Sequence, residues 1–190
     1  MLTKESKKII LQIAKDAIKE AVLKKNIINK EELLKKYPWL NKKGAVFVTI
    51  NKQNSLRGCI GSIIAHQSLL DDIIQNAKSA SLNDPRFKPI SKDELEHLDI
   101  EVSVLTPPKE LKYKDILDLK AKIKIGVDGV ILRYKNHQAT YLPSVWEQLP
   151  SFELFFTHLC QKANLMGNCL EYHPVIYTYQ AIKIDKKSLQ

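Results

Sequence analysis

Several features that would place a sequence in a large known class are missing from this chain. Its apolar runs are short, with residues 45–50 as a typical example, and lysines interrupt the N-terminal segment every few residues. A transmembrane helix needs about 20 consecutive apolar residues, and a signal peptide needs an unbroken apolar stretch after its basic start. We therefore predict that the chain has neither segment and that the protein is cytoplasmic.

Signatures of the common nucleotide-binding and hydrolytic folds are absent as well. The sequence has no Rossmann glycine motif, no P-loop, no GxSxG and no HExxH, and it shows no internal repeat, low-complexity segment or flexible linker. We expect no cofactor.

Cysteine is scarce, and its spacing argues against a disulfide framework and against a structural zinc site. Cys59, Cys160 and Cys169 contain no CxxC pair, and an odd count in a cytosolic chain predicts free thiols. The five histidines are scattered, and none has a second ligand at metal spacing. We therefore expect no metal site.

The positive charge is concentrated at the N-terminus. Residues 1–43 contain twelve lysines and five acidic residues, which gives +7 of the formal net charge of +9. Lysine without interleaved arginine or aromatic residues is typical of a solvated helix face and is weak evidence for nucleic-acid binding. We predict that the protein does not bind nucleic acid.

The order of the elements predicts an α+β fold. With 190 residues, 44% of them apolar, the chain can build a substantial core. We expect one domain over residues 1–190, with a helical part at 1–43, forming a small N-terminal helical lobe, and an α+β body at 44–190. The sheet is expected to be mixed and mainly antiparallel, flanked by helices. Apolar periodicity predicts helices at residues 4–25, 30–36, 68–81, 115–119 and 151–167, a β-hairpin within 44–61, strands at 100–105 and 175–184, and a meander at 123–127, 130–134 and 139–142 in the same domain as the hairpin.

The stretch from residue 56 to 61, Leu-Arg-Gly-Cys-Ile-Gly, brings a cation, a thiol and two glycines together within six residues. In an extended strand, Arg57 and Cys59 share one face, while Leu56 and Ile60 face a core. The two glycines let a ligand or another backbone approach the main chain. The alternative is a buried strand with two bulge glycines, in which the cysteine is only a small hydrophobe.

Two further polar positions stand out. In the loop at residues 83–87, Pro85 fixes one dihedral and Asp84 can orient Arg86. This segment can also be no more than a helix stop with a surface ion pair. Glu101 is a carboxylate in the middle of a strand, which makes it a candidate partner for an arginine.

Several motifs together resemble the AMMECR domain family over nearly the whole chain. They are found at residues 56–61, 84–87 (Asp-Pro-Arg-Phe), 100–108, 129–133 and 139–150. The resemblance implies a two-lobed α+β fold with a cleft lined by the segment around Cys59, in a family without an established activity. Bacterial and archaeal members often occur with a Memo-like protein and a radical SAM protein in the AmmeMemoRadiSam system, of which this chain would be component A. The stretch at 165–169 is less similar, so Cys169 receives no role.

Two classes of function remain open at this point. In the first, the protein is an enzyme that acts on a small anionic substrate, and Arg57 stabilises the thiolate of Cys59, making it the most reactive thiol. In the second, the same cleft binds a ligand or docks on the partner proteins without catalysis. The candidate catalytic residues are Cys59 (nucleophile or acid/base), Asp84 and Glu101, and the candidate substrate-binding residues are Arg57, Gly58, Gly61, Arg86, Trp146 and Glu147.

Overall fold

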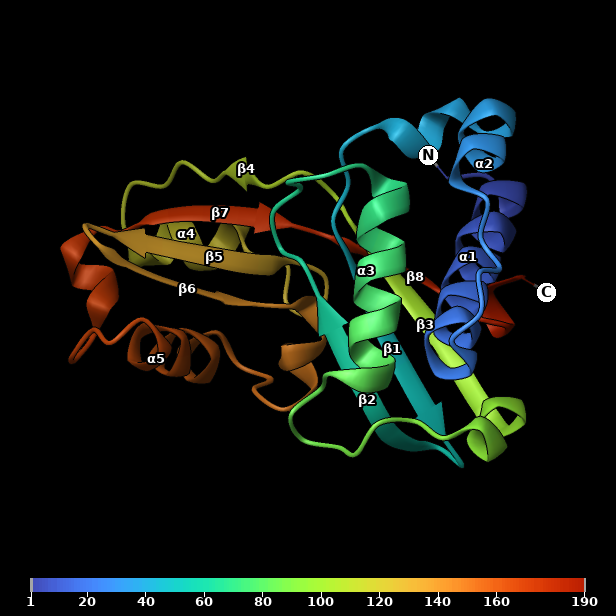
Figure 1. The fold of residues 1–190 in the computed structure, drawn as a ribbon. Helices are drawn as coiled ribbons and strands as arrows, with labels where there is room; N and C mark the ends of the chain where they lie inside the picture. Colours follow the sequence, from blue (N-terminus) through green and yellow to red (C-terminus); the bar gives the residue numbers. More distant parts are fainter. Residues whose placement is uncertain (1, 190) are drawn as a thin grey trace. The chain divides into compact units, whose positions relative to one another are not determined.

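The computed structural model describes residues 2–189 and divides the chain into two compact units. The first unit comprises residues 2–105 and 182–189, and the second comprises Thr106–Ala181. Each unit contains a four-stranded sheet with helices (Figure 1). Within the described residues, no helix is both long and apolar enough to cross a membrane.

The sheet of the first unit has the strand order β2-β1-β3-β8. β1 is central and pairs antiparallel with both β2 and β3. The predicted hairpin is therefore confirmed, and its turn at Gln53 and Asn54 uses two residues with positive φ, as tight hairpin turns require. The strands are β1 (Val46–Lys52), β2 (Ser55–Gly61), β3 (Leu98–Leu105) and β8 (Ala181–Ile184).

Helices cover one face of this sheet. Ser68 caps α3 by accepting a hydrogen bond from the N–H of Asp71, and Thr3 caps α1 in the same way at Ser6. The apolar stripes of both helices pack with residues from β1 and β3 in one buried cluster, so the helical N-terminal segment packs on the first sheet. The helices of this unit are α1 (Lys4–Leu23), α2 (Lys30–Lys36) and α3 (Leu69–Leu82), with 3₁₀ turns at Pro38–Asn41, Lys92–His97 and Lys187–Leu189.

The second unit has its own sheet and core. Its strand order is β4-β7-β5-β6, and all three pairings are antiparallel. Trp146 stacks on Phe155 at a centroid distance of 3.7 Å and donates its indole N–H to the carbonyl of Asp128. The elements are β4 (Lys109–Glu110), α4 (Ile116–Lys122), β5 (Gly129–Tyr134), β6 (His137–Tyr141), α5 (Phe152–Lys162) and β7 (Val175–Tyr179), with 3₁₀ turns at Pro143–Glu147 and Cys169–Tyr172.

The α+β class is confirmed, and three details of the predicted sheet are corrected. The predicted closing strand at 175–184 is two strands, β7 and β8, which lie in different sheets. The hairpin and the strands after residue 129 lie in different sheets and different units. Residues 123–127 form no strand, because the Asp128 carboxylate accepts from the N–H of Lys124 and Gly126 has a φ of +79°, which together close a turn. The place beside β5 is taken by β7 from the end of the chain.

The prediction of three free thiols is wrong for two of them. Cys160, near the end of α5, and Cys169 form a disulfide. Between them Asn164 and Gly167 have positive φ, so the chain reverses after the helix and brings the second cysteine back to the first. The spacing of nine residues carried no such signal. The cytoplasmic location remains a prediction.

Candidate functional site

A β-bulge separates Arg57 from Cys59. Thr49 is opposite Cys59 and Ile50 is opposite Gly58, but Asn51 is opposite Leu56, so Arg57 is the extra residue on β2. A bulge bends its strand and redirects the side chain. Leu56 is 41% exposed, which corrects the expectation that it anchors the strand in the core. Ile60 does pack partly against the core.

The guanidinium of Arg57 on β2 is bound by the segment at residues 88–94. Its Nε and Nη2 donate to the two carboxylate oxygens of Glu94, each at 3.0 Å. Its Nη1 donates to the carbonyl of Lys88 at 2.7 Å, and Nη2 reaches the carbonyl of Pro89 at 3.3 Å. Such a forked pair is strong and directional. The expected pairing of Arg57 with the sulfur of Cys59 is therefore corrected: this arginine ties β2 to the segment at 88–94.

Glu94 should make the stability of the protein sensitive to acid. The hydrogen bonds from Arg57 are the main cause that lowers the pKa of Glu94 from 4.5 to about 2. A lowered pKa in the folded state contributes stability that is complete above pH 4.5 and is lost as the pH falls towards 2. Replacing Glu94 by glutamine should cost roughly 1–2 kcal/mol at pH 7.

The measurement is urea unfolding of the wild type and Glu94→Gln between pH 7 and pH 2. The difference between the two proteins should shrink below pH 4.5. Glu96→Gln is the matched control, because Glu96 is an exposed carboxylate in the same 3₁₀ turn. A constant difference across the whole pH range would contradict the assignment.

The Asp84–Arg86 pair holds the main chain of Cys59. The N–H of Cys59 donates to Asp84 Oδ2 at 2.8 Å, and Nη2 of Arg86 donates to the carbonyl of Cys59 at 3.3 Å. Arg86 also donates to both oxygens of Asp84, from Nε at 3.0 Å and from Nη2 at 2.8 Å, and its own N–H donates to Oδ1. Both polar groups of Cys59 on its main chain are thus bound by one ion pair.

This ion pair is unequally buried. The side chain of Asp84 is 1% exposed, whereas that of Arg86 is 54% exposed. The hydrogen bonds from Arg86 are the main cause that holds the pKa of Asp84 far below its ordinary value, and burial opposes them. A plain surface ion pair does not describe this geometry, because a buried carboxylate is retained only when it is well paired.

The thiol of Cys59 lies in a row of polar side chains across the sheet. Thr49 pairs with Cys59 on one side and with Glu101 on the other. The Oγ1 of Thr49 lies 3.3 Å from the Sγ of Cys59, and Lys183 on β8 forms an ion pair of 2.6 Å with Glu101. Because side chains alternate along a strand, this row faces away from the helices, whose core takes Val48 and its buried neighbours on β1. The expected arginine partner of Glu101 is corrected to Lys183.

The two glycines have different neighbours. A Cβ on Gly58 would lie 2.2 Å from the carbonyl oxygen of Ala80 on α3, so this glycine lets the helix approach the strand. A Cβ on Gly61 would meet the ring of Phe47 at 2.3 Å, on the face that carries Cys59. Gly58 therefore serves packing against α3, while Gly61 makes room for an aromatic ring.

Trp146 and Glu147 belong to the second unit. Trp146 is 3% exposed and lies in the core of that unit, so its side chain stabilises the fold, and its role as a substrate-binding residue remains a prediction. Glu147 is exposed on the neighbouring 3₁₀ turn, and its role as a substrate-binding residue remains a prediction.

Three residues of the site region were not selected from the sequence: Thr49, Glu94 and Lys183. Alternation along residues 45–50 places Thr49 on the face opposite to Val46 and Val48, but the apolar, β-branched composition of the run favours a wholly buried strand. Glu94 was recognised only as part of a capping box, which it does form with Ser91. Nothing local to Lys183 indicates Glu101, which is 82 positions earlier.

The arrangement around Cys59 offers a thiol, a hydroxyl and a half-exposed guanidinium. Among the described residues, Nη1 of Arg86 makes no hydrogen bond, and Cys59 is the one free cysteine of the three. Groups of three or more histidine, cysteine and acidic side chains able to hold a metal ion are not found in residues 2–189. The arrangement therefore suits anion binding by Arg86, whose guanidinium contacts the main chain of the free cysteine.

Comparison with known proteins gives consistent matches along the chain. The AMMECR1 family model matches residues 11–184. A protein of Saccharolobus islandicus is 40% identical over 179 residues, covering 88% of this chain and 75% of its own length. A protein of Methanothermobacter thermautotrophicus is 35% identical over 188 residues and covers 95% and 94% of the two chains. The crystal structure of the uncharacterised protein PH0010 from Pyrococcus horikoshii matches with a TM-score of 0.81 at 32% identity, covering 96% of this chain and 92% of the other.

Proposed function

The chain belongs to the AMMECR1 family, and we propose a function for it from the site itself. Cys59 and Arg86 form a site for a small anionic molecule, with Cys59 acting as nucleophile or as proton donor and acceptor. Arg86 binds the anionic group, and Asp84 holds both residues in place. Glu101 and Thr49 contribute the polar face beside the sulfur.

One observation carries this proposal. Arg86 is fixed by a buried carboxylate on one side and still presents Nη1 on a side chain that is 54% exposed. A guanidinium that is oriented in advance binds carboxylate or phosphate groups with little further loss of side-chain freedom. The same ion pair fixes the backbone of the free cysteine, so a bound anion would lie near the thiol.

We infer from the resemblance to the family that the protein works with a Memo-like protein and a radical SAM protein. A non-catalytic role, as the ligand-binding or docking partner of those proteins, is the second candidate. It is favoured by the hydrogen bonding of Cys59, whose sulfur pairs with the hydroxyl of Thr49 and, among the described residues, forms no hydrogen bond with a histidine or carboxylate side chain. A thiol without an adjacent base is a weaker nucleophile.

Alkylation of the native protein tests the proposal. For each reagent, the rate at native Cys59 is divided by the rate at Cys59 in denaturant. We expect this ratio to be higher for iodoacetate, which is anionic, than for the neutral iodoacetamide. Denatured Cys59 is the reference because Cys160 and Cys169 form a disulfide. Arg86→Gln should lower the iodoacetate preference by about threefold or more, read at Cys59 by mass spectrometry.

Two further variants make the result specific. Lys88→Gln removes the same charge from an exposed side chain of the same loop and should leave the preference unchanged. Arg86→Lys keeps the charge beside Asp84 and protects the fold, and it should give an intermediate preference. If native Cys59 reacts no faster than denatured Cys59 with either reagent, the catalytic role is to be dropped in favour of the recognition role. If the anionic preference is also missing, the anion site itself fails.

A further inference from the structure

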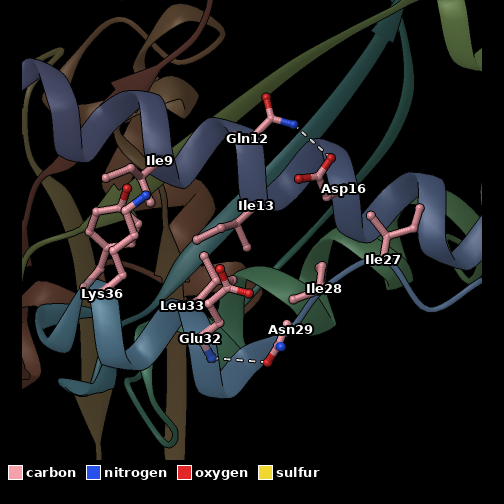
Figure 2. A pocket seen from close by; sticks show the side chains of 11 residues that line it. Ile9, Gln12, Ile13, Asp16, Ile27, Ile28, Asn29, Glu32, Leu33 and Lys36 are labelled. Atoms are coloured by element: carbon pink, nitrogen blue, oxygen red, sulfur yellow. Dashed lines mark hydrogen bonds between the residues drawn. The ribbon is translucent and has the colours of Figure 1, made fainter.

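A pocket of about 330 Å³ lies in the first unit between α1 and the chain at 27–37 (Figure 2). It contains none of the residues around Cys59, so it is independent of the function proposed above. Its apolar walls come from Ile9 and Ile13 on α1, from Ile28, and from Leu33 on α2. Ligand sites in proteins begin at about this volume and combine apolar walls with a few polar groups.

Two carboxylates line the pocket without a cationic partner. The side-chain amide of Gln12 donates to Asp16 Oδ1 at 2.8 Å, and within the described residues no lysine or arginine forms an ion pair with Asp16. Within residues 2–189, the side chain of Glu32 forms neither a hydrogen bond nor an ion pair. Lys36, one turn further along α2, directs its ammonium to the ring of Tyr37, 5.4 Å from the centroid.

This pattern is unusual for its surroundings. Residues 1–43 hold twelve lysines and only five acids, yet two of those five line this one pocket, against one lysine. Figure 2 shows Ile9 and Lys36 at one end, Asp16 and Ile27 at the other, and Ile13 and Leu33 between them. A local excess of negative charge inside a strongly basic segment favours a cation at this place over an anion.

We propose that this pocket binds a small organic ammonium compound with an apolar body. The apolar body packs on the isoleucines and Leu33, where its surface is removed from water. The ammonium group lies between Asp16 and Glu32, which compensate its charge. Lys36 and Tyr37 close the far end of the pocket and disfavour a second cationic group there.

The test uses three molecules of nearly equal shape: 2-phenylethylammonium, 2-phenylethanol and 3-phenylpropanoate. Binding is followed by amide chemical shifts of the full chain at low salt. We expect saturable shifts at residues 9–16 and 27–37 with the ammonium compound, and affinity lower by about fivefold or more for the alcohol. The anion should bind more weakly than the alcohol, and added salt should weaken the ammonium compound alone.

A matched pair of double variants isolates the two carboxylates. Asp16→Asn with Glu32→Gln should lower the affinity for the ammonium compound about fivefold or more while leaving the alcohol unchanged. Glu5→Gln with Glu31→Gln makes the same charge change on exposed positions of the same two helices and should change neither affinity. Equal binding of all three molecules, shifts outside the pocket, or equal loss in both double variants would overturn the proposal.

Discussion

Replacing Asp84 by asparagine is expected to lower the free energy of unfolding by about 3 kcal/mol at pH 7, because the partner of a buried ion pair is removed. The buried carboxylate accepts four hydrogen bonds, three from Arg86 and one from the N–H of Cys59. An amide of the same shape must turn its NH₂ group towards at least one of these donors. The expected loss of free energy of unfolding is at the lower end for a broken buried ion pair, because the guanidinium of Arg86 is half exposed and can be hydrated by solvent.

The effect should depend on pH with a defined sign. The pKa of Asp84 is depressed in the folded state, chiefly by the hydrogen bonds from Arg86. Its contribution is therefore complete above the unfolded value of 3.8 and declines as the pH falls through the folded value. Urea unfolding at pH 7, 4 and 2 should show the gap between wild type and variant narrowing only below pH 4.

The same variant also tests the site. Removing the clamp on the Cys59 backbone should bring the alkylation rates of native Cys59 close to those in denaturant. Asp93→Asn is the control, since Asp93 is an exposed carboxylate of the neighbouring 3₁₀ turn and should change neither stability nor alkylation. A variant as stable as the wild type would show that the ion pair contributes nothing net.

Gly58→Ala should cost about 3 kcal/mol or more, at the upper end of what overpacking a core usually costs. The new Cβ would lie 2.2 Å from the carbonyl oxygen of Ala80, which is main chain and cannot rotate away. Strand β2 and helix α3 must then separate. The free energy of unfolding from urea titration gives the size of the loss.

Gly61→Ala is the matched comparison on the same strand. Its Cβ would meet the ring of Phe47 at 2.3 Å, and a side chain can change rotamer at a cost of about 1 kcal/mol. We expect Gly61→Ala to be clearly less destabilising than Gly58→Ala. If both variants lost the same free energy of unfolding, the main-chain contact of Gly58 with α3 would be no more restrictive than the side-chain contact of Gly61 with Phe47.

Local patterns were enough to predict where the helices begin and the first hairpin, but the last helix, expected to reach residue 167, ends at Lys162. The stripe of isoleucines and alanines in residues 4–25 and the cap at Ser68 each act within a few residues, and α1 and α3 begin and end within two residues of the prediction. The predicted strand at residues 123–127 was wrong, because the turn made by Gly126 and Asp128 overrides the strand preference of the β-branched residues there. The single sheet failed because strand periodicity does not say which strand is the neighbour.

The candidate site was predictable in part. Asp84 and Arg86 are two residues apart, so their pairing follows from the sequence, and Cys59 and Glu101 were correctly placed on strands. The partner of Arg57 was missed because a bulge at Ile50 and Asn51 redirects its side chain, and strict alternation assumes that no bulge is present.

The sequence by itself determined the α+β class, the family, the antiparallel hairpin and the motifs that contain Cys59, Asp84 and Arg86, because each of these depends on short-range periodicity or on a contiguous motif. Only the tertiary structure decided that Arg86 rather than Arg57 holds Cys59, that Lys183 pairs with Glu101, and that Cys160 bonds to Cys169. These contacts depend on strand register, on one bulge and on two chain reversals. Such features arise from the packing of segments far apart in the sequence, where no local residue pattern records the partner.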